Sequence, residues 1–571
     1  MKSSAVAVIL ALALCSAAQA TDRYAIPSTL NSQLSAAVAG DRVILAPGTY
    51  GHLWLSGKDG APGNLIQIIA QDPANRPVVL NPGSEGWQIF DCSYLLFDGI
   101  VMQGAIDEGF HLQHTEMTHH IIMRNCDVTM ASASGNTDCW KSDQTHDTLF
   151  YNCRASTCGD CGFDNMAARD ALIMRSYMTD TGNSGVHAKN GSYNFGFYRN
   201  VHVSSGERSL QFGGNGTYAR DQVAMGNVLI GSPYAVAYTT VRYCDFAYNT
   251  VVDPTSAVMR FLNENPGGGV TTAYNSFTNN LVRYTCGTWA AGPDTEPATT
   301  TFADNFWSKT PSLPAAETGT VVGDPNLDAE YRPLNGDARD YGAHAPGMEE
   351  AFQAWRADHG DAFAWAWSYA VIYDPDARAG GPYTVYKHGS EGGSVQLDGA
   401  GSYAGNNPNA DLPNYHQNAI SAYSWDLDGD NVFADAAGAT PTVTYSQLAG
   451  WGRGAAGSYQ IELAITAATD WGQMKDWDTA QLLVAEAPDG DANFDGCVDG
   501  LDYNQWSLHY LQAGGWGDGN FNGDGTIDGL DHNTWSLNYL SGCEGAGVPE
   551  PVCLAFFAAG GLLVLRRRRR A

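Results

Sequence analysis

A short pattern recurs through residues 123–306: an apolar pair, an Asn or a small residue, and then another apolar residue. Its central residues are Asn125, Asn152, Ser176, Asn200, Asn227, Asn249, Asn280 and Asn305, at successive intervals of 27, 24, 24, 27, 22, 31 and 25 residues. The segments between them are rich in β-branched and aromatic residues and contain no long amphipathic helix. This composition and period predict a parallel β-solenoid, because one coil cannot bury its apolar face without a neighbour. We expect the Asn side chains to hydrogen-bond along the stack.

The predicted fold class is all-β, and its main body is a right-handed parallel β-helix over residues 25–346. Residues 34–51 resemble the N-terminal cap of such helices, with a helical turn at 34–38 and the first strand and turn at 40–50. A cap is needed because the terminal coil would otherwise expose its core and a strand edge. Residues 347–375 are predicted to be a connecting helical segment.

Residues 376–487 carry short alternating strands separated by Gly, Asp and Asn turns, for example around 395–399 and 423–430. This pattern predicts a β-sandwich. The motifs resemble the PKD-type immunoglobulin-like module. The resemblance implies a spacer or a binding module and no catalysis.

Residues 489–543 hold two copies of an acidic loop. The first copy places Asp491, Asn493, Asp495, Cys497, Asp499 and Asp502 at loop positions 1, 3, 5, 7, 9 and 12, and the second places Asn520, Asn522, Asp524, Thr526, Asp528 and Asp531 there. Oxygen ligands at alternate positions, with a Gly at position 6, are typical of a Ca²⁺ loop. The duplicated loop and helix resemble the dockerin module, which implies Ca²⁺ as cofactor and a cohesin-like partner. The first loop is predicted to bind more tightly, because Asn520 brings one less negative charge than Asp491.

Both ends of the chain predict export. Lys2, an apolar run and small residues at 18–20 predict a signal peptide over residues 1–20. Residues 548–571 combine a Pro-Glu-Pro motif, an apolar run and five arginines, and resemble the PEP-CTERM sorting signal. The resemblance implies an exosortase-type processing enzyme, a transient C-terminal membrane segment and a body at the cell surface or outside the cell.

Export permits disulfides. Cys497 and Cys543 are candidates for a disulfide that staples the acidic-loop module. Cys126 and Cys153 occupy the same place in adjacent repeats, and either pair or stack as small apolar groups.

The formal charge of −31 argues against nucleic acid or an anionic membrane as a partner. The charge is uneven, because residues 141–260 contain ten Lys and Arg and ten Asp and Glu. An acidic polysaccharide would therefore meet this neutral stretch and not the acidic last third of the chain.

Strand alternation places the candidate functional residues on one outward face. The predicted inward pairs are Phe110/Leu112, Trp140/Ser142, Phe163/Asn165, Val186/Ala188 and Leu210/Phe212. The outward residues then form two ladders: His111, Lys141, Asp164, His187, Gln211 and, two coils further on, Arg260; and Gln113, Asp143, Met166, Lys189 and Gly213. Coils lie about 4.8 Å apart, so these residues would share one polar strip. The prediction requires Lys189 to stand on a solvent-facing sheet, and a one-residue slip would reverse every side chain.

The capped β-helix resembles the secreted polysaccharide lyases, most closely the alginate lyase and chondroitinase-B family. Ala188-Lys189-Asn190 fits the lysine coil of that family, whereas Gly213 and Gly214 replace its Arg and His in the next coil. The resemblance implies β-elimination from an acidic polysaccharide. In this hypothesis Lys189 is the proton-abstracting base.

β-Elimination needs neutralisation of the substrate carboxylate, a base and an acid. Arg208 or Arg260 would neutralise the carboxylate, and His187 or Lys141 would handle further protons. The pKa of a Lys base must shift toward neutrality, which nearby Arg and His are expected to achieve. The predicted substrate-binding residues are His111, Asp143, Asp164, Gln211 and Arg260.

Two alternatives stay open from the residues alone. The face could belong to a glycoside hydrolase that uses Asp143 and Asp164, or to a non-catalytic surface adhesin that binds glycans. A further Ca²⁺ in the β-helix is a second cofactor hypothesis.

Overall fold

The computed structural model describes residues 20–113, 117–132, 134–214, 217–264, 269–291 and 295–543, without the side chains of residues 288–291. The predicted sorting segment at 548–571, and the predicted signal peptide except for its last residue, lie outside the described residues. The chain divides into two compact units. The first is formed by Met1–Asp376, Tyr403–Ser421 and Thr466–Asp476, and the second by Ala377–Ser402, Ala422–Ile465 and Trp477–Ala571.

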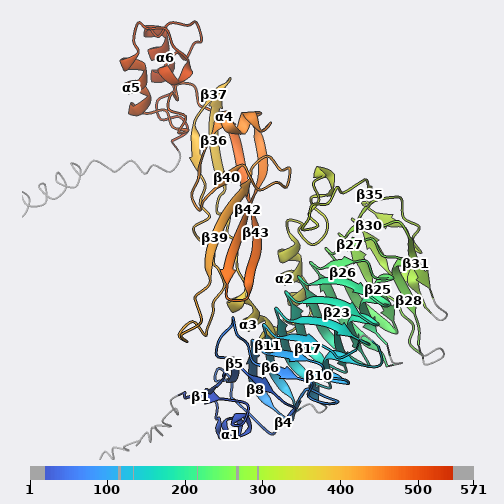
Figure 1. The fold of residues 1–571 in the computed structure, drawn as a ribbon. Helices are drawn as coiled ribbons and strands as arrows, with labels where there is room; N and C mark the ends of the chain where they lie inside the picture. The colour runs from blue at the N-terminus through green and yellow to red at the C-terminus, as the bar shows by residue number, and fades with distance from the viewer. Residues whose placement is uncertain are drawn as a thin grey trace, which may run out of the picture. The chain divides into compact units, whose positions relative to one another are not determined.

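The first unit is a right-handed parallel β-helix, as predicted, whose coils contribute strands to three parallel sheets (Figure 1). The 13-stranded sheet contains β1 (Asp22–Ala25), β2 (Arg42–Leu45), β5 (Ile66–Ala70), β8 (Ser93–Asp98), β11 (His119–Arg124), β14 (His146–Tyr151), β17 (Arg169–Met174), β20 (Tyr193–Tyr198), β23 (Ala219–Met225), β26 (Val241–Ala247), β29 (Ser276–Thr278), β32 (Thr301–Ala303) and β34 (Glu317–Thr318). The 12-stranded sheet contains β3 (Thr49–Tyr50), β6 (Val78–Leu80), β9 (Val101–Gln103), β12 (Asp127–Thr129), β15 (Arg154–Cys158), β18 (Tyr177–Thr181), β21 (Val201–Ser205), β24 (Val228–Ile230), β27 (Thr250–Val252), β30 (Leu281–Arg283), β33 (Phe306–Trp307) and β35 (Val321–Val322). The 10-stranded sheet contains β4 (Leu53–Ser56), β7 (Trp87–Phe90), β10 (Glu108–Gln113), β13 (Asp138–Asp143), β16 (Phe163–Met166), β19 (Ser184–Lys189), β22 (Arg208–Gly213), β25 (Tyr234–Thr239), β28 (Ala257–Leu262) and β31 (Gly287–Ala291).

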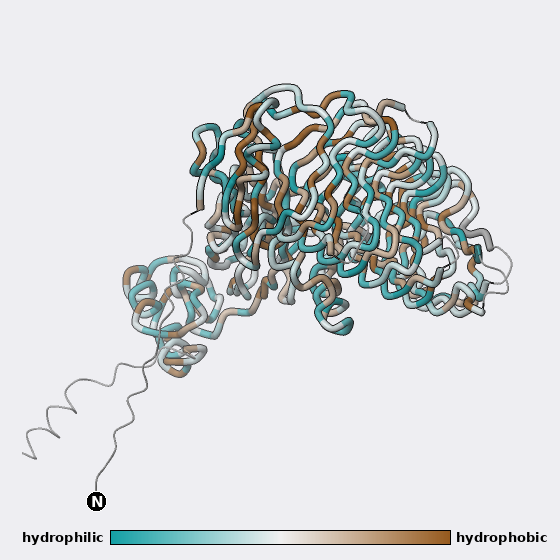
Figure 2. The backbone as a smooth tube through the Cα atoms, turned by 90° about the horizontal axis from the view of Figure 1, so that it is seen from below, coloured by the Kyte–Doolittle hydropathy of each residue, from teal (hydrophilic) through white to brown (hydrophobic). Residues whose placement is uncertain are grey.

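Apolar side chains from all three sheets fill the interior of the β-helix. Trp140 stacks between Phe110 and Phe163, with ring centroids 4.8 and 5.7 Å away. Such stacks form because residues in register on neighbouring parallel strands point the same way. Hydrophobic and hydrophilic positions accordingly recur along successive coils in Figure 2.

The predicted asparagine ladder runs through the later coils. Asn200 Nδ2 donates to Asn227 Oδ1 at 3.1 Å, and Asn227 Nδ2 donates to Asn249 Oδ1 at 2.8 Å. The same contact continues from Asn249 through Asn280 to Asn305. The ladder satisfies buried amides that would otherwise cost free energy.

The predicted alignment is wrong by one residue in the first two repeats. Strand pairing places Cys126 and Cys153, and not Asn125 and Asn152, in the column of Ser176. Asn125 and Asn152 take the preceding turn position instead, with φ of 54° and 51°, a left-handed conformation that Asn tolerates. Cys126 and Cys153 are free, buried thiols, so they stack and do not pair.

Helices cover one end and one face of the β-helix. α1 (Leu30–Ala36) buries Leu30 and Leu34, and forms earlier than the predicted turn at 34–38 because this i, i+4 pair faces the core. α2 (Met348–Asp358) and α3 (Ala364–Tyr373) pack on the outer side of the 13-stranded sheet. Two short 3₁₀ turns are η1 (Pro297–Thr299) and η2 (Gly336–Ala338).

The strands after α3 form a six-stranded sheet in the order β37-β36-β43-β42-β39-β40 and a two-stranded pair, β38-β41. Their bounds are β36 (Tyr383–His388), β37 (Glu391–Gly392), β38 (Ser394–Gln396), β39 (Ala419–Asp426), β40 (Ala436–Ala437), β41 (Thr442–Thr444), β42 (Gly457–Thr469) and β43 (Gly472–Glu486). α4 (Tyr445–Gly450) follows β41. Trp425, Leu463 and Leu482 are buried in the second unit.

The chain of the second unit ends in two similar helices, α5 (Gly500–Leu508) and α6 (Gly529–Leu537), with η3 (Trp516–Asp518) between them. Trp506 Nε1 donates to the carbonyl of Asp528, and Trp535 Nε1 donates to the carbonyl of Asp499. The indole of each helix thus donates to the backbone at the start of the other helix. A disulfide joins Cys497 and Cys543, which confirms that prediction.

The described part of the chain is mostly β with few helices, as the predicted class requires. None of these helices is both long and apolar enough to span a membrane.

Candidate functional site

The outward face of the 10-stranded sheet carries the predicted polar strip in the predicted register. The first ladder is formed by the successive Cα partners His111, Lys141, Asp164, His187, Gln211, Ala237 and Arg260. The second contains Asp143, Met166 and Lys189. Sheet pairing therefore gathers these side chains on one face.

A network of charges occupies the middle of this face. Lys141 Nζ lies 3.0 Å from Glu108 Oε1, 3.3 Å from Asp138 Oδ2 and 3.8 Å from Asp164 Oδ2. Lys189 Nζ lies 2.8 Å from Asp164 Oδ1. Burial raises the pKa of all three carboxyl groups, and repulsion from Asp164 adds to the rise in the pKa of Asp138.

Two predictions about Lys189 are wrong. Its side chain leaves the interior but is only 10% exposed, so it does not stand on an open surface. Burial opposes its charge, yet the Asp164 carboxylate raises the pKa of Lys189 above its ordinary value and not toward neutrality. A lysine that holds its proton more tightly is a poorer base near pH 7. Both differences arise because Lys189 of the second ladder forms an ion pair with Asp164 of the first ladder.

His187 and Gln211 are enclosed in the same region. His187 Nε2 donates to the carbonyl of Gly213 at 2.9 Å, and burial lowers the pKa of His187 well below its ordinary value, so the ring is neutral. The Gln211 side chain is buried, and neither amide atom has a hydrogen-bond partner among the described residues. An unsatisfied buried amide is costly and needs an explanation such as a functional role.

His111 lies between two carboxylates at the N-terminal end of the face. Its Nδ1 is 3.2 Å from Glu85 Oε2, and its Nε2 is 3.2 Å from Asp143 Oδ2. Burial disfavours the imidazolium, but the hydrogen bond to Asp143 and the nearby acids raise the pKa of His111. The Asp143 side chain is 14% exposed, and its Oδ1 has no hydrogen-bond partner in the described part of the chain. This end therefore offers a carboxylate oxygen beside a protonatable ring.

The predicted carboxylate neutralisers lie at the other end and already have acidic partners. Arg208 Nη2 is 2.9 Å from Glu207 Oε2, and Arg260 pairs with the same carboxylate. Arg208 also donates to Ser184 Oγ at 3.0 Å and to Asn183 Oδ1 at 2.7 Å. Burial lowers the pKa of Arg208.

Four acids of this face escaped the sequence-based prediction: Glu85, Glu108, Asp138 and Glu207. Glu108 and Asp138 are Cα partners three residues before His111 and Lys141, an odd interval that strict alternation assigns to the opposite face, so the ladders did not predict them. Glu85 and Glu207 precede their strands. Alternation gives no side-chain direction there, so the sequence held no signal for them.

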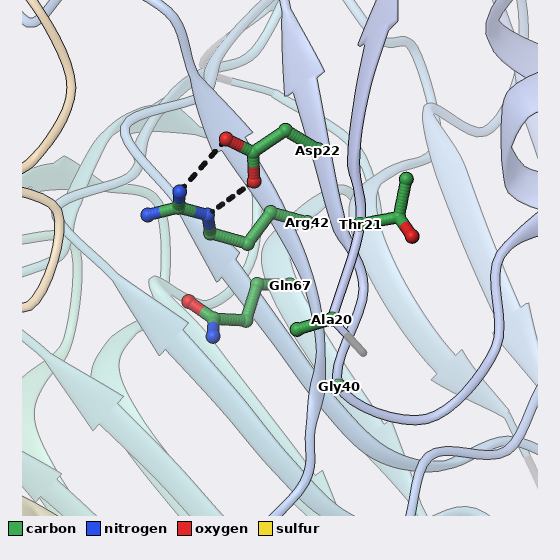
Figure 3. Close-up of a pocket in the computed structure, with 6 residues that line it drawn as sticks. All are labelled: Ala20, Thr21, Asp22, Gly40, Arg42 and Gln67. Carbon is green, nitrogen blue, oxygen red and sulfur yellow. Dashed lines mark hydrogen bonds and ion pairs between the residues drawn. The ribbon is translucent and has the colours of Figure 1, made fainter. Parts of the chain in front are cut away.

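A separate pocket lies near the start of the β-helix (Figure 3). It is lined by Ala20, Thr21, Asp22, Gly40, Arg42 and Gln67. Arg42 is 2.7 Å from Asp22 and 2.6 Å from Asp411, so its charge is already paired. No residue of the polar strip lines this pocket.

The first acidic loop has the shape of a cation-binding loop. Gly496 turns the chain at position 6 with φ 87°. Asp502 Oδ1 accepts from the backbone of Ala492 and Asn493 at 2.8 and 3.1 Å. Asp491 Oδ1 is buried without a hydrogen-bond partner among the described residues, and burial raises the pKa of Asp491 to about 6. A carboxylate oxygen held among other oxygen donors fits Ca²⁺.

The second loop repeats this frame with one difference. Asp531 Oδ1 accepts from the backbone of Phe521 and Asn522 at 2.7 and 3.0 Å. Asn520, in place of Asp491, accepts from Gly523 N at 3.0 Å through its Oδ1. Because the Asn520 amide is neutral, the second loop carries one negative charge less at this position than the first loop.

No family model matches this chain, and no curated protein matches it in sequence. Solved structures with a similar fold include the GH136 lacto-N-biosidase from Eubacterium ramulus, with 11% identity and a TM-score of 0.40 over 53% of this chain and 68% of that one. An alginate lyase from Paenibacillus sp. str. FPU-7 has 16% identity and a TM-score of 0.36 over 53% and 99% of the two chains. The A-module of a mannuronan C-5 epimerase from Azotobacter vinelandii has 13% identity and a TM-score of 0.37 over 52% and 94%. At these values the similarity is one of fold.

Proposed function

We propose that this protein is an exported carbohydrate-active enzyme that hydrolyses a polysaccharide on the outward face of its 10-stranded sheet. The observation that carries the proposal is the charge pairing of that face. Lys141, Lys189, Arg208 and Arg260 each lie beside a carboxylate, and the acids include groups with raised pKa. This pairing favours carboxylate acid–base chemistry over a free lysine base.

Glycoside hydrolysis needs two carboxyl groups, one protonated and one ionised. Glu108 is the proposed proton donor, because burial raises the pKa of Glu108. Asp143 is the proposed base or nucleophile, because its Oδ2 contacts His111 and its Oδ1 has no hydrogen-bond partner among the described residues. Asp164 is 1% exposed and paired to Lys189, so it orders the network and does not touch substrate.

β-Elimination at Lys189 is the weaker alternative on this geometry. It would need a lysine with a lowered pKa and a free cation for the uronate carboxylate. Lys189 has a raised pKa, and Arg208 and Arg260 share Glu207. An acidic polysaccharide could bind only by displacing these ion pairs.

Asp143→Asn and Lys189→Ala separate the two chemistries on a panel of neutral and acidic glycans. Hydrolysis predicts new reducing ends without unsaturated products, and loss of activity in Asp143→Asn. Asp180→Asn, an exposed aspartate on β18, is the matched control and keeps full activity. Unsaturated products that vanish in Lys189→Ala would establish the lyase instead, and glycan binding without cleavage would establish the adhesin.

We also propose that residues 489–543 form a dockerin-like module that binds Ca²⁺ and docks on a cohesin-like partner. Leu508 and Leu537, at matching ends of α5 and α6, are 69% and 84% exposed, a surface suited to a protein partner. Calorimetry of the full chain should show two Ca²⁺ sites, the first loop tighter. Asn520→Asp should tighten the second, and two equal sites in the unaltered chain would contradict this assignment.

For the two ends of the chain and for residues 376–487 we propose export, exosortase-type processing at 548–571 and a PKD-like spacer at 376–487. The support is the order of the motifs in the sequence. Intact-mass measurement of protein released from the producing cell tests the processing. A mass that still includes the five terminal arginines would contradict it.

A further inference from the structure

Three imidazoles and a carboxylate meet where β11 and β14 begin, on the 13-stranded sheet and away from the polar strip. His146 Nδ1 lies 2.6 Å from Asp147 Oδ2, and His120 Nδ1 lies 3.8 Å from the same oxygen. His119 Nδ1 lies 2.7 Å from His120 Nδ1. These nitrogen and oxygen atoms are ligand atoms for a transition metal.

The fold itself produces this convergence. His119 and His146 are Cα partners on neighbouring strands, and their rings stack with centroids 4.8 Å apart. His120 and Asp147 follow them with φ of 57° and 53°. A left-handed residue interrupts the strand alternation, so consecutive side chains stay on the same side of the sheet. Two adjacent coils therefore bring His120, His146 and Asp147 together.

The distances suit a single small ion. Zn²⁺ binds imidazole nitrogen at about 2.0–2.1 Å, which places tetrahedral ligand atoms roughly 3.3 Å from one another. The 2.6 and 3.8 Å separations from Asp147 Oδ2 bracket that spacing. The side chains of His120, His146 and Asp147 are 18%, 17% and 23% exposed, so an ion could reach them. Tyr94 and Trp365 pack against the His120 ring and restrict its movement.

We propose that His120, His146 and Asp147, whose ligand atoms all lie within 4.8 Å of one another, bind a divalent transition metal of the Zn²⁺ type. An imidazole-rich set favours such an ion over Ca²⁺ or Mg²⁺, which prefer oxygen ligands. The site is distinct from the acidic loops of residues 489–543.

A pocket of about 480 Å³ adjoins the proposed ion. Its lining includes Tyr94, His120 and Trp365. His120 belongs to both the pocket and the ligand set, so the pocket gives the ion a route from solvent. Arg169 is the Cα partner of His146 in the next coil. Its positive charge disfavours a second metal ion on that side of the cluster.

Calorimetric titration of the full chain with ZnCl₂ tests the proposal, in millimolar Ca²⁺ so that the acidic loops are occupied. The expected result is one Zn²⁺ per chain with a Kd of about 1 µM or tighter. The double variant His120→Ala/His146→Ala should bind at least about 100-fold more weakly. His416→Ala is the matched control, since His416 is an 81% exposed histidine outside the cluster, and it should bind as the unaltered chain does.

A second variant guards against loss of folding. Asp147→Asn keeps the side-chain volume and should weaken Zn²⁺ binding by about 10-fold with an unchanged thermal transition. Co²⁺ in place of Zn²⁺ should give the visible absorption of a four-coordinate site with histidine ligands. Binding weaker than about 100 µM in the unaltered chain, or equal binding by Asp147→Asn and the unaltered chain, would overturn the proposal.

Discussion

Two outward columns of residues on the same β-helix are both largely buried, yet one is apolar and the other is charged. On the 13-stranded sheet the outward column contains Leu96, Ile122, Leu149, Leu172, Gly196 and Val223. Its apolar members are at most 2% exposed and pack against α2 and α3. On the 10-stranded sheet the corresponding column carries His111, Lys141, Asp164, His187 and Gln211.

The difference indicates what contacts each face: helices of the same chain on one, and the proposed ligand on the other. The apolar face is completed by the chain itself: Phe352 stacks on Tyr198 with centroids 3.9 Å apart, and Gly196 leaves room for the Phe363 ring. The charged face costs free energy to bury, and it keeps unsatisfied atoms on Gln211 and Asp143. Burial alone therefore does not distinguish a packing column from a candidate site, whereas the polarity of the buried side chains does.

The largest expected effect is on catalysis at the charged face. Asp143→Asn should lower glycan cleavage by about 10²- to 10⁴-fold, because it removes the carboxylate charge while keeping the shape. Turnover and the thermal transition of the same preparation are the measurements. Unchanged turnover in a folded variant would remove Asp143 from the mechanism.

The packing face should respond in stability and not in activity. Phe352→Ala should lower the free energy of unfolding by about 3–5 kcal/mol, because it leaves a cavity between α2 and the sheet. Denaturant titration measures the loss, and activity per folded molecule should stay the same. A selective loss of activity would mean that the two faces are not independent.

A pair of substitutions compares the two columns directly. Gln211→Met should be neutral or stabilise by about 1 kcal/mol, because it removes a buried amide that has no partner among the described residues. Leu149→Gln should destabilise by about 1–3 kcal/mol, because it buries a new amide against α3. Equal destabilisation by the two, measured in denaturant, would show that Gln211 is satisfied in solution.

The smallest effect is a pH dependence at the charged face. The folded pKa of His111 is raised above its ordinary value of 6.5, so its contribution to stability is fully present below about pH 6.5 and is lost as pH rises through the folded pKa. His111→Gln should flatten this part of the stability profile. An NMR titration that finds the pKa of His111 at or below 6.5 in the folded chain would contradict the charge arrangement of this face.

The sequence predicts the coils well because their rules are local. Alternation around residues such as Phe163 and Val186 fixed the register of five strands, and pairing confirms it. The one-residue error at Asn125 arose because Asn serves both as ladder residue and as left-handed turn residue. The burial of Lys189 and its pairing with Asp164 depend on side-chain reach between ladders, which no spacing encodes.

The repeat in the sequence contains a signal for part of the histidine cluster. His119 and His146 are separated by 27 residues, the same interval as Asn125 and Asn152, so the repeat alone placed them side by side. The left-handed backbone at His120 could not be deduced from composition. That conformation brings His120 close to Asp147, which also lies beside His146.

The chemistry of the charged face is tested most directly by the products formed from neutral and acidic polysaccharides. Mass spectrometry and ultraviolet absorbance identify these products. A carboxylate-based face predicts saturated products with a new reducing end and one added water, lost in Asp143→Asn and retained in Asp180→Asn. Unsaturated products without added water, lost in Lys189→Ala, would contradict it.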